Sequence, residues 1–164
     1  MDELNDWLDP PSVPIDSFSG DYFFLSNFYP VEIEYEGLTY QSSEHAYQAA
    51  KSLDPEVRKL FTDPKMLAGQ AKKLGRKIEA RPDWNIVRAD VMQDIISIKF
   101  DNDELREKLL ATAFRELIEG NWWGDRYWGV CDGEGLNMLG RLLMKERDRL
   151  LAESFFTFKD DKDA

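Results

Sequence analysis

Residues 40–53, YQSSEHAYQAAKSL, bring together residue types that can carry acid–base and nucleophilic chemistry. A serine at position 42 or 43 can cap a helix that begins near Glu44. At about 100° per residue, Glu44, Gln48 and Lys51 then share one face, with roughly 10 Å along the axis between the first and the last. A carboxylate and an ammonium at this separation could each bind a different part of one ligand. An ordinary solvated face is the alternative that spacing leaves open.

The single histidine, His45, limits the catalytic classes. Zinc sites need several histidine or cysteine ligands at short spacing, and the chain has one histidine and one cysteine, Cys131. A serine hydrolase would need a G-x-S-x-G motif to pair with His45, and the sequence has none. A Cys131–His45 hydrolase is a weak alternative. Carboxylates and lysines must therefore carry any catalysis, and we expect neither a metal nor a cofactor.

A second candidate segment is rich in glycine and aromatic residues: residues 121–140, NWWGDRYWGVCDGEGLNMLG. Glycines at this density interrupt helices and strands, so the tryptophans suit a loop whose rings stack on a planar ligand. A structural loop with tryptophan plugs is the open alternative. Asp125 and Asp132 are candidate acids here. Asn137 can either cap the last helix or bind ligand.

A third candidate segment is basic although the chain as a whole is acidic. Residues 69–81, GQAKKLGRKIEAR, hold Lys72, Lys73, Arg76, Lys77 and Arg81, against a net charge of −11. A phosphate would need such a cationic patch, whereas a basic helix face that balances acidic neighbours is the simpler interpretation. Trp84 follows and either lines a pocket or packs.

The composition bounds the partners and the compartment. With 164 residues, 43% hydrophobic and 13% aromatic, the chain predicts one folded domain. The net charge of −11 disfavours sequence-independent nucleic-acid binding and leaves a small phosphorylated ligand open. One cysteine, no signal-peptide pattern and no apolar run of about 20 residues predict a cytoplasmic protein without membrane association. No obligate protein partner is predicted.

Hydrophobic periodicity places the candidate segments on an α+β fold. Val31, Ile33 and Tyr35 alternate with glutamates as in a half-buried strand, and Glu36 with the next glycine predicts a two-residue hairpin turn. Helical spacing follows from residue 42 onward, at 87–98, 105–117 and 137–151. Asp-Pro pairs at 54–55 and 63–64 predict two helix starts.

These elements predict a mainly helical single domain with a small antiparallel sheet near the N-terminus. We expect an acidic, proline-containing arm over residues 1–16, the domain over residues 17–158 and a charged tail over residues 159–164. The absence of βαβ alternation argues against a doubly wound sheet.

Taken together, the segments resemble the YbiA-like, or NADAR, family. The resemblance covers nearly all of residues 17–152, with distinctive motifs in the expected order. The matching motifs are LSNFYP at 25–30, YQSSEHAYQAAK at 40–51, DPKMLAGQAKKLGR at 63–76, DWNIVRADVMQDIISIKF at 83–100, LLATAFRELIEGNWWGDRYWG at 109–129 and GLNMLGRLLMKERDRL at 135–150. One departure is VCDGEG after Gly129, which carries acids where members often have a more basic or neutral loop.

The resemblance implies an N-glycosidase that cleaves the bond between a ribose anomeric carbon and an amine. Family members act on ribosylaminopyrimidine phosphates of riboflavin biosynthesis, or on ADP-ribose attached to guanine, which extends the implied partners to ADP-ribosylated guanine in nucleic acid. The implied catalytic residues are Glu44, Lys51 and Asp125. The implied substrate-binding residues are Asn27, Phe28, Tyr40, Gln48, Lys72, Arg76, Trp84, Tyr127, Trp128, Gly129 and Asn137.

A competing hypothesis is a module that binds a nucleotide or ADP-ribose without hydrolysing it. Binding alone does not require Glu44, Lys51 and Asp125 together, so their joint presence favours an enzyme. Lys51 keeps two possible roles, a cation that clamps the ligand or a nucleophile that forms a Schiff base with the sugar.

Overall fold

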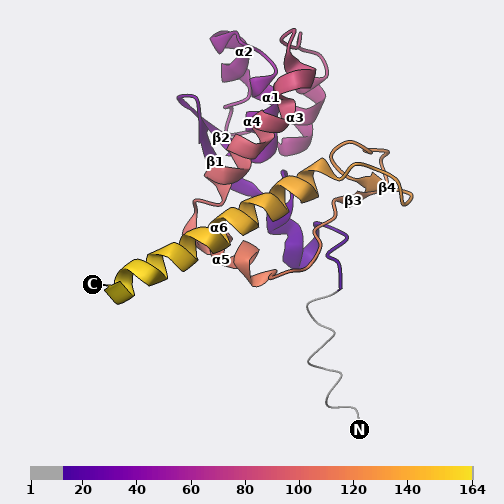
Figure 1. Cartoon of the computed structure of the whole chain (residues 1–164). Helices are drawn as coiled ribbons and strands as arrows, with labels where there is room; N and C mark the ends of the chain where they lie inside the picture. Colours follow the sequence, from indigo (N-terminus) through magenta and orange to yellow (C-terminus); the bar gives the residue numbers. More distant parts are fainter. Residues whose placement is uncertain (1–12, 164) are drawn as a thin grey trace. The chain divides into compact units, whose positions relative to one another are not determined.

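The computed structural model describes residues 13–163 of the chain. It divides into two compact units, Ser26–Asn102 and a second unit formed by Met1–Leu25 with Asp103–Ala164. Most of the predicted N-terminal arm lies outside the described residues. The fold is mostly helical with a small antiparallel sheet early in the chain, which confirms the predicted α+β class (Figure 1).

The unit Ser26–Asn102 begins with an antiparallel hairpin of β1 (Pro30–Tyr35) and β2 (Leu38–Ser42). Along β1 the side chains of Ile33 and Tyr35 are buried while the intervening glutamates are exposed, as the alternation predicted. Tyr35 pairs directly with Leu38, so Glu36 and Gly37 form the predicted two-residue turn. Both have positive φ, 47° and 86°, the backbone conformation that such a tight hairpin needs.

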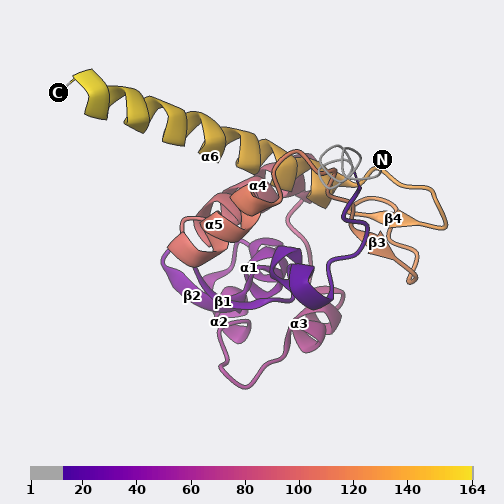
Figure 2. The same ribbon diagram turned by 90° about the horizontal axis from the view of Figure 1, so that it is seen from below.

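Helix α1 (Ser43–Ala50) follows β2 directly, with Ser42 as its N-cap. The Ser42 Oγ accepts a hydrogen bond from the His45 amide, as predicted for a serine at this position. The helix contacts β1, β2, α2 (Pro55–Leu60), α3 (Ala68–Gly75) and α4 (Trp84–Lys99), and Figure 2 shows the strands and helices gathered around it. All eight of its residues are buried. The solvated-face interpretation of this segment is therefore wrong.

The two Asp-Pro pairs behave differently. Asp54 caps α2 through a hydrogen bond from the Glu56 amide, as predicted. Asp63 makes the equivalent hydrogen bond, with its Oδ1 accepting from the Lys65 amide, but a turn and not a helix follows it. Helix α3 begins five residues after Asp63, at Ala68.

The other unit holds a 3-10 helix, η1 (Gly20–Leu25), and α5 (Asp103–Ala111), followed by β3 (Gly120–Asn121) and β4 (Val130–Cys131). The predicted helical run to residue 117 was too long. Ala113 has a φ of 52°, which ends the helix, and Leu117 forms a parallel bridge with Ile15. Strands β3 and β4 add a short parallel pair that the sequence did not predict.

Helix α6 (Met138–Asp163) closes the chain and is longer than predicted. It continues from the predicted helix through the segment expected as a charged tail, up to Asp163 (Figure 1). Charged residues at this density support a helix as well as a coil, because Arg149 pairs with Glu146 and Glu153 one turn away on either side.

Candidate functional site

The predicted face of α1 exists, and it is enclosed by the protein. Glu44 is 7% exposed and Gln48 is 5% exposed. The Gln48 Nε2 donates to the Glu44 Oε1 at 2.8 Å. A carboxylate held by a neighbouring amide in a dry setting is oriented, and its charge acts more strongly than it would in water.

Lys51, at the C-cap of α1, is half-buried and its Nζ donates to the Gly75 carbonyl at 3.3 Å. Burial lowers the pKa of Lys51 from its ordinary value, the charge of Glu44 opposes that shift, and the charge of Arg76 adds to it. The structure therefore places Glu44, Lys51 and Arg76 within electrostatic reach of one another.

Gly75 on α3 is a residue of this site that sequence reasoning missed. A side chain there would have its Cβ 1.8 Å from the Gln48 Oε1. The same Oε1 atom is buried without a hydrogen-bond partner among the described residues, as is the Ser43 Oγ at the start of α1. Buried polar atoms normally have partners, so these two atoms on α1 are exceptions in the buried part of the helix. In the sequence, only a glycine within the basic segment hinted at this close approach.

A turn over residues 26–29 presents two further predicted residues in the same unit. The Asn27 carbonyl accepts a hydrogen bond from the Glu44 amide at 3.0 Å. The ring of Phe28 lies 6.0 Å from the Lys72 Nζ, within reach of a cation–π contact. The backbone of Asn27 thus contacts the start of α1, Phe28 and Lys72 lie close to one another, and Arg76 is exposed just beyond the end of α3.

The aromatic residues predicted to bind substrate in this unit are mostly enclosed. Trp84 is 8% exposed, and its ring lies 5.0 Å from that of Tyr47 on α1. Tyr40 is 1% exposed, and burial raises the pKa of its hydroxyl. Full burial places Tyr40 in the core beneath α1, so its predicted contact with substrate finds no support in the geometry.

His45 is a structural residue in this arrangement. It is 2% exposed, with Nδ1 at 2.7 Å from the Ser42 Oγ and Nε2 at 2.8 Å from the Met66 carbonyl. Both ring nitrogens are therefore engaged by the protein. The histidine ties the start of α1 to the segment before α3.

The remaining predicted residues form a second cluster in the other unit. The Asp125 Oδ1 accepts from the Tyr127 and Trp128 amides at 3.1 and 2.9 Å. The two rings meet edge to face with centroids 4.8 Å apart. Asn121, which sequence reasoning missed, donates to the Asp125 carbonyl and accepts from the Asp125 amide. Asp125 thus shapes the loop that carries the two aromatic rings.

Gly129 and Asn137 have packing duties in the same loop. A Cβ on Gly129 would lie 1.8 Å from the Glu119 carboxylate and 2.1 Å from the Glu119 carbonyl. The Asn137 side chain donates to the Leu117 carbonyl and accepts from the Glu119 amide. Both ends of the Asn137 amide are engaged by backbone, which favours a structural role over ligand binding. The other candidate acid of the loop, Asp132, lies 3.9 Å from Arg126 on an exposed surface.

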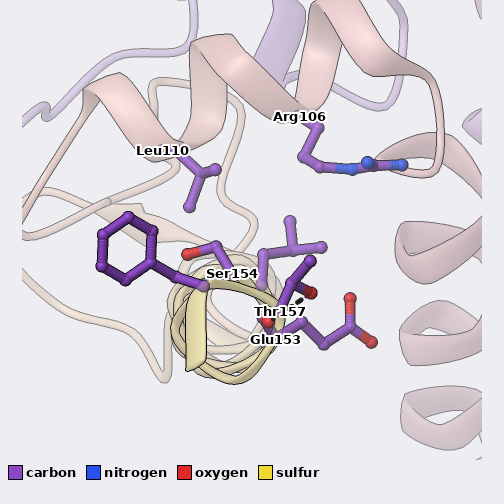
Figure 3. A pocket seen from close by; sticks show the side chains of 7 residues that line it. Arg106, Leu110, Glu153, Ser154 and Thr157 are labelled. Carbon is purple, nitrogen blue, oxygen red and sulfur yellow. Dashed lines mark hydrogen bonds between the residues drawn. The ribbon is translucent and has the colours of Figure 1, made fainter. Parts of the chain in front are cut away.

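A surface pocket between α5 and α6 contains none of the predicted residues (Figure 3). Its lining comes from one face of each helix: Arg106, Leu110, Leu150, Glu153, Ser154, Thr157 and Phe158. Within residues 13–163, no group of histidine, cysteine or acidic side chains is arranged to hold a metal ion. Over the same residues, no helix is long and apolar enough to cross a membrane.

Comparison with known proteins identifies the family. The NADAR domain profile matches residues 16–151, which is most of the chain. The chain belongs to the NADAR family. N-glycosidase YbiA of Escherichia coli strain K12 is 37% identical to it over 142 residues, which are 84% of this chain and 87% of YbiA. The NMR structure of E. coli YbiA superposes with a TM-score of 0.77 and covers 87% of this chain and 86% of YbiA.

A riboflavin biosynthesis protein of Vibrio vulnificus extends the NADAR comparison to a longer protein. It is 41% identical over 131 residues, which are 77% of this chain and 35% of that relative. This NADAR chain therefore matches about a third of the Vibrio protein and nearly the full length of YbiA.

Proposed function

We propose that this chain is a hydrolase that acts on N-glycosyl bonds and cleaves the bond between a ribose anomeric carbon and a nitrogen. The observation that carries the proposal is the buried Glu44–Gln48 pair beside Lys51, with the unpartnered Oε1 of Gln48 next to it. Several relatives are named N-glycosidases, among them YbiA of E. coli and a protein of Nostoc punctiforme. Their names agree with chemistry that a carboxylic acid and an amine can perform.

The substrate class follows from the charges around this face. Arg76 adds positive charge near Lys51, and Lys72 lies on α3, the helix whose Gly75 carbonyl accepts from Lys51, in a chain whose net charge is −11. A local cluster of this size suits one or two phosphates and not a long polyanion. We therefore propose a phosphorylated ribosylamine, such as a ribosylaminopyrimidine phosphate of riboflavin biosynthesis, or an ADP-ribosyl group on guanine. A cytoplasmic location remains a prediction.

In the proposed reaction, Glu44 is the acid that protonates the leaving nitrogen. Its amide partner Gln48 donates a hydrogen bond to one carboxyl oxygen at 2.8 Å, which fixes the orientation of the carboxyl group. The developing positive charge on the ribose is stabilised once Glu44 is ionised, which is the pattern for bonds that break through an oxocarbenium-like state.

Lys51 supplies either a fixed cation or a nucleophile. The lowered pKa of Lys51 favours the nucleophile, because it raises the fraction of neutral amine. As a nucleophile, the amine attacks the anomeric carbon while the C–N bond to the base breaks and the base leaves with a proton from Glu44. The sugar ring then opens to a Schiff base, and water hydrolyses this to free sugar and amine.

The first test is Glu44→Gln, assayed separately with ADP-ribosylated guanosine and with the ribosylaminopyrimidine phosphate. We expect release of base to fall by about 10³-fold, the usual contribution of a general acid. The melting temperature should not change, because glutamine keeps an acceptor for Gln48. Glu34→Gln on the exposed edge of β1 is the matched control and should behave as wild type.

Two results would overturn the proposal. Wild-type rates in Glu44→Gln would remove Glu44 from the chemistry. Tight binding of both ligands by the wild-type protein, with no base released from either, would instead identify a binding module without hydrolase activity.

A further inference from the structure

A lysine is buried near the end of α4. Lys99 is 2% exposed, its Nζ donates to the Ser26 carbonyl at 2.9 Å, and the ring centroids of Tyr29 and Phe100 lie at 5.7 and 5.4 Å. Lysines are almost never fully buried, because removing the ammonium from water is costly. An apolar side chain of similar size would fill this place at lower cost. The position therefore suggests a role other than stability.

The carbonyl group to which Lys99 donates belongs to Ser26, the first residue of the 26–29 turn. The Ser26 carbonyl also accepts from the Tyr29 amide at 3.2 Å, and the Ser26 Oγ accepts from the Phe28 amide at 3.1 Å. Serine at the start of a turn closes it in this way. Lys99 thus binds the atom on which the turn closes.

The same turn holds the start of α1. The Asn27 carbonyl accepts from the Glu44 amide at 3.0 Å, and the Asn27 side chain lies 3.6 Å from the Met92 sulfur. Amides in the first turn of a helix have no partner within that helix, so an outside acceptor fixes where the helix begins. The location of the Asn27 carbonyl therefore sets the placement of the helical turn that carries Glu44.

We propose that Lys99 is a positioning residue for Glu44, which acts by fixing the 26–29 turn whose Asn27 carbonyl holds the Glu44 amide. The inference rests on the proposed function of Glu44. Lys99 lies behind the turn and does not touch the ligand in this role. Its loss should therefore lower kcat and leave KM unchanged, because it disturbs the orientation of the acid and not the binding surface.

The burial of the Lys99 ammonium gives this role a measurable signature. Burial lowers the pKa of Lys99 to about 7. The ammonium forms a charge-assisted hydrogen bond with the Ser26 carbonyl, and the neutral amine forms a weaker one. Tyr29 is the titratable side chain that the Lys99 ammonium contacts. A change near neutral pH in the turn therefore reports Lys99.

The kinetic test compares Lys99→Met with Lys108→Met, a control at a half-exposed lysine on α5. We expect kcat of Lys99→Met to fall roughly 10- to 100-fold, with KM within about twofold of wild type, as for a misplaced catalytic group. Lys108→Met should match wild type. Unchanged kcat in Lys99→Met, or a rise in KM alone, would overturn the inference.

The second test uses no substrate, so it separates this inference from the proposed function. In wild-type protein with ¹³C-labelled lysine, the Lys99 Cε signal and the Tyr29 and Glu44 amide signals should titrate with one midpoint near pH 7. In Lys99→Met, the shift of the Tyr29 and Glu44 amide signals with a midpoint near pH 7 should be absent. The neighbouring His45 is the same in both proteins, so the difference between them reports Lys99 alone. Different midpoints in the wild type would overturn the inference even if the variant failed to fold.

Discussion

Helix α1 and the loop over residues 121–137 both carry carboxyl and amide side chains, and the two regions use them differently. On α1, Gln48 keeps an acceptor without a partner, and Lys51 is held where burial works against its charge. In the loop, Asp125 and Asn137 bind backbone amides and carbonyls. The contrast separates a buried polar atom without a protein partner from polar groups that shape a loop, which composition alone does not distinguish.

The strongest test of this contrast is Lys51→Met. On the α1 side we expect turnover to fall on the order of 10²- to 10³-fold, the range seen when one preorganised electrostatic group is removed. Borohydride added during turnover should trap a lysine–sugar adduct in wild type and none in Lys51→Met, as detected by mass spectrometry. A wild-type protein that turns over but gives no adduct assigns Lys51 the role of a cation clamp. Lys51→Arg should then recover part of the rate.

A second test crowds the unpartnered acceptor. In Gly75→Ala the new Cβ would collide with the Gln48 side chain, whose Oε1 and Cδ lie 1.8 and 2.6 Å away. The displaced amide would release Glu44, so we expect kcat/KM to fall roughly 10- to 100-fold. Gly69→Ala is the matched control on the same helix, with open space around its Cβ, and should keep full activity. Equal activity of the two variants would show that Gln48 does not orient the acid.

The smallest expected effect is in the loop. Asp125→Asn keeps an oxygen that can accept from the Tyr127 and Trp128 amides, so we expect turnover to change by less than about threefold. Asp125→Ala loses both hydrogen bonds and should lower the free energy of unfolding by about 1–3 kcal/mol in a denaturant titration. A loss of turnover beyond about 100-fold in Asp125→Asn, with unchanged stability, would make Asp125 a catalytic acid and end the contrast.

Local patterns in the sequence predicted the part of the fold that local forces decide. The alternation before Glu36, the turn at Glu36–Gly37 and the serine cap of α1 all appear in the structure. The prediction failed at Asp63 and at Ala113. At Ala113 a left-handed residue ends the helix at a single position, and averaged periodicity does not register such an event. Asp63 makes the same local hydrogen bond as the capping residue Asp54, so an aspartate before a proline does not by itself decide whether a helix follows.

The sequence predicted which residue types form the candidate site. It did not predict whether their side chains are buried or exposed to solvent. Spacing placed Glu44, Gln48 and Lys51 on one face of a helix, and it left open whether that face was solvated. The answer depends on α3, whose Gly75 lets Gln48 approach, and α3 is distant in sequence. Lys99 shows the same limit. A lysine at the end of a helix is typical of a solvated C-terminus, and here its burial reveals the contact with Ser26.

The bridge between Ile15 and Leu117 has a practical consequence for truncation. Ile15 is 2% exposed, its amide donates to the Glu116 carbonyl, and its own carbonyl accepts from the Ile118 amide. The NADAR profile begins at residue 16, so an expression clone cut at the family boundary would remove this residue. It would leave two backbone groups unpaired and open an apolar surface beside Leu117. A shortened protein intended for crystallisation should therefore start at or before Val13, whose carbonyl accepts from Arg115.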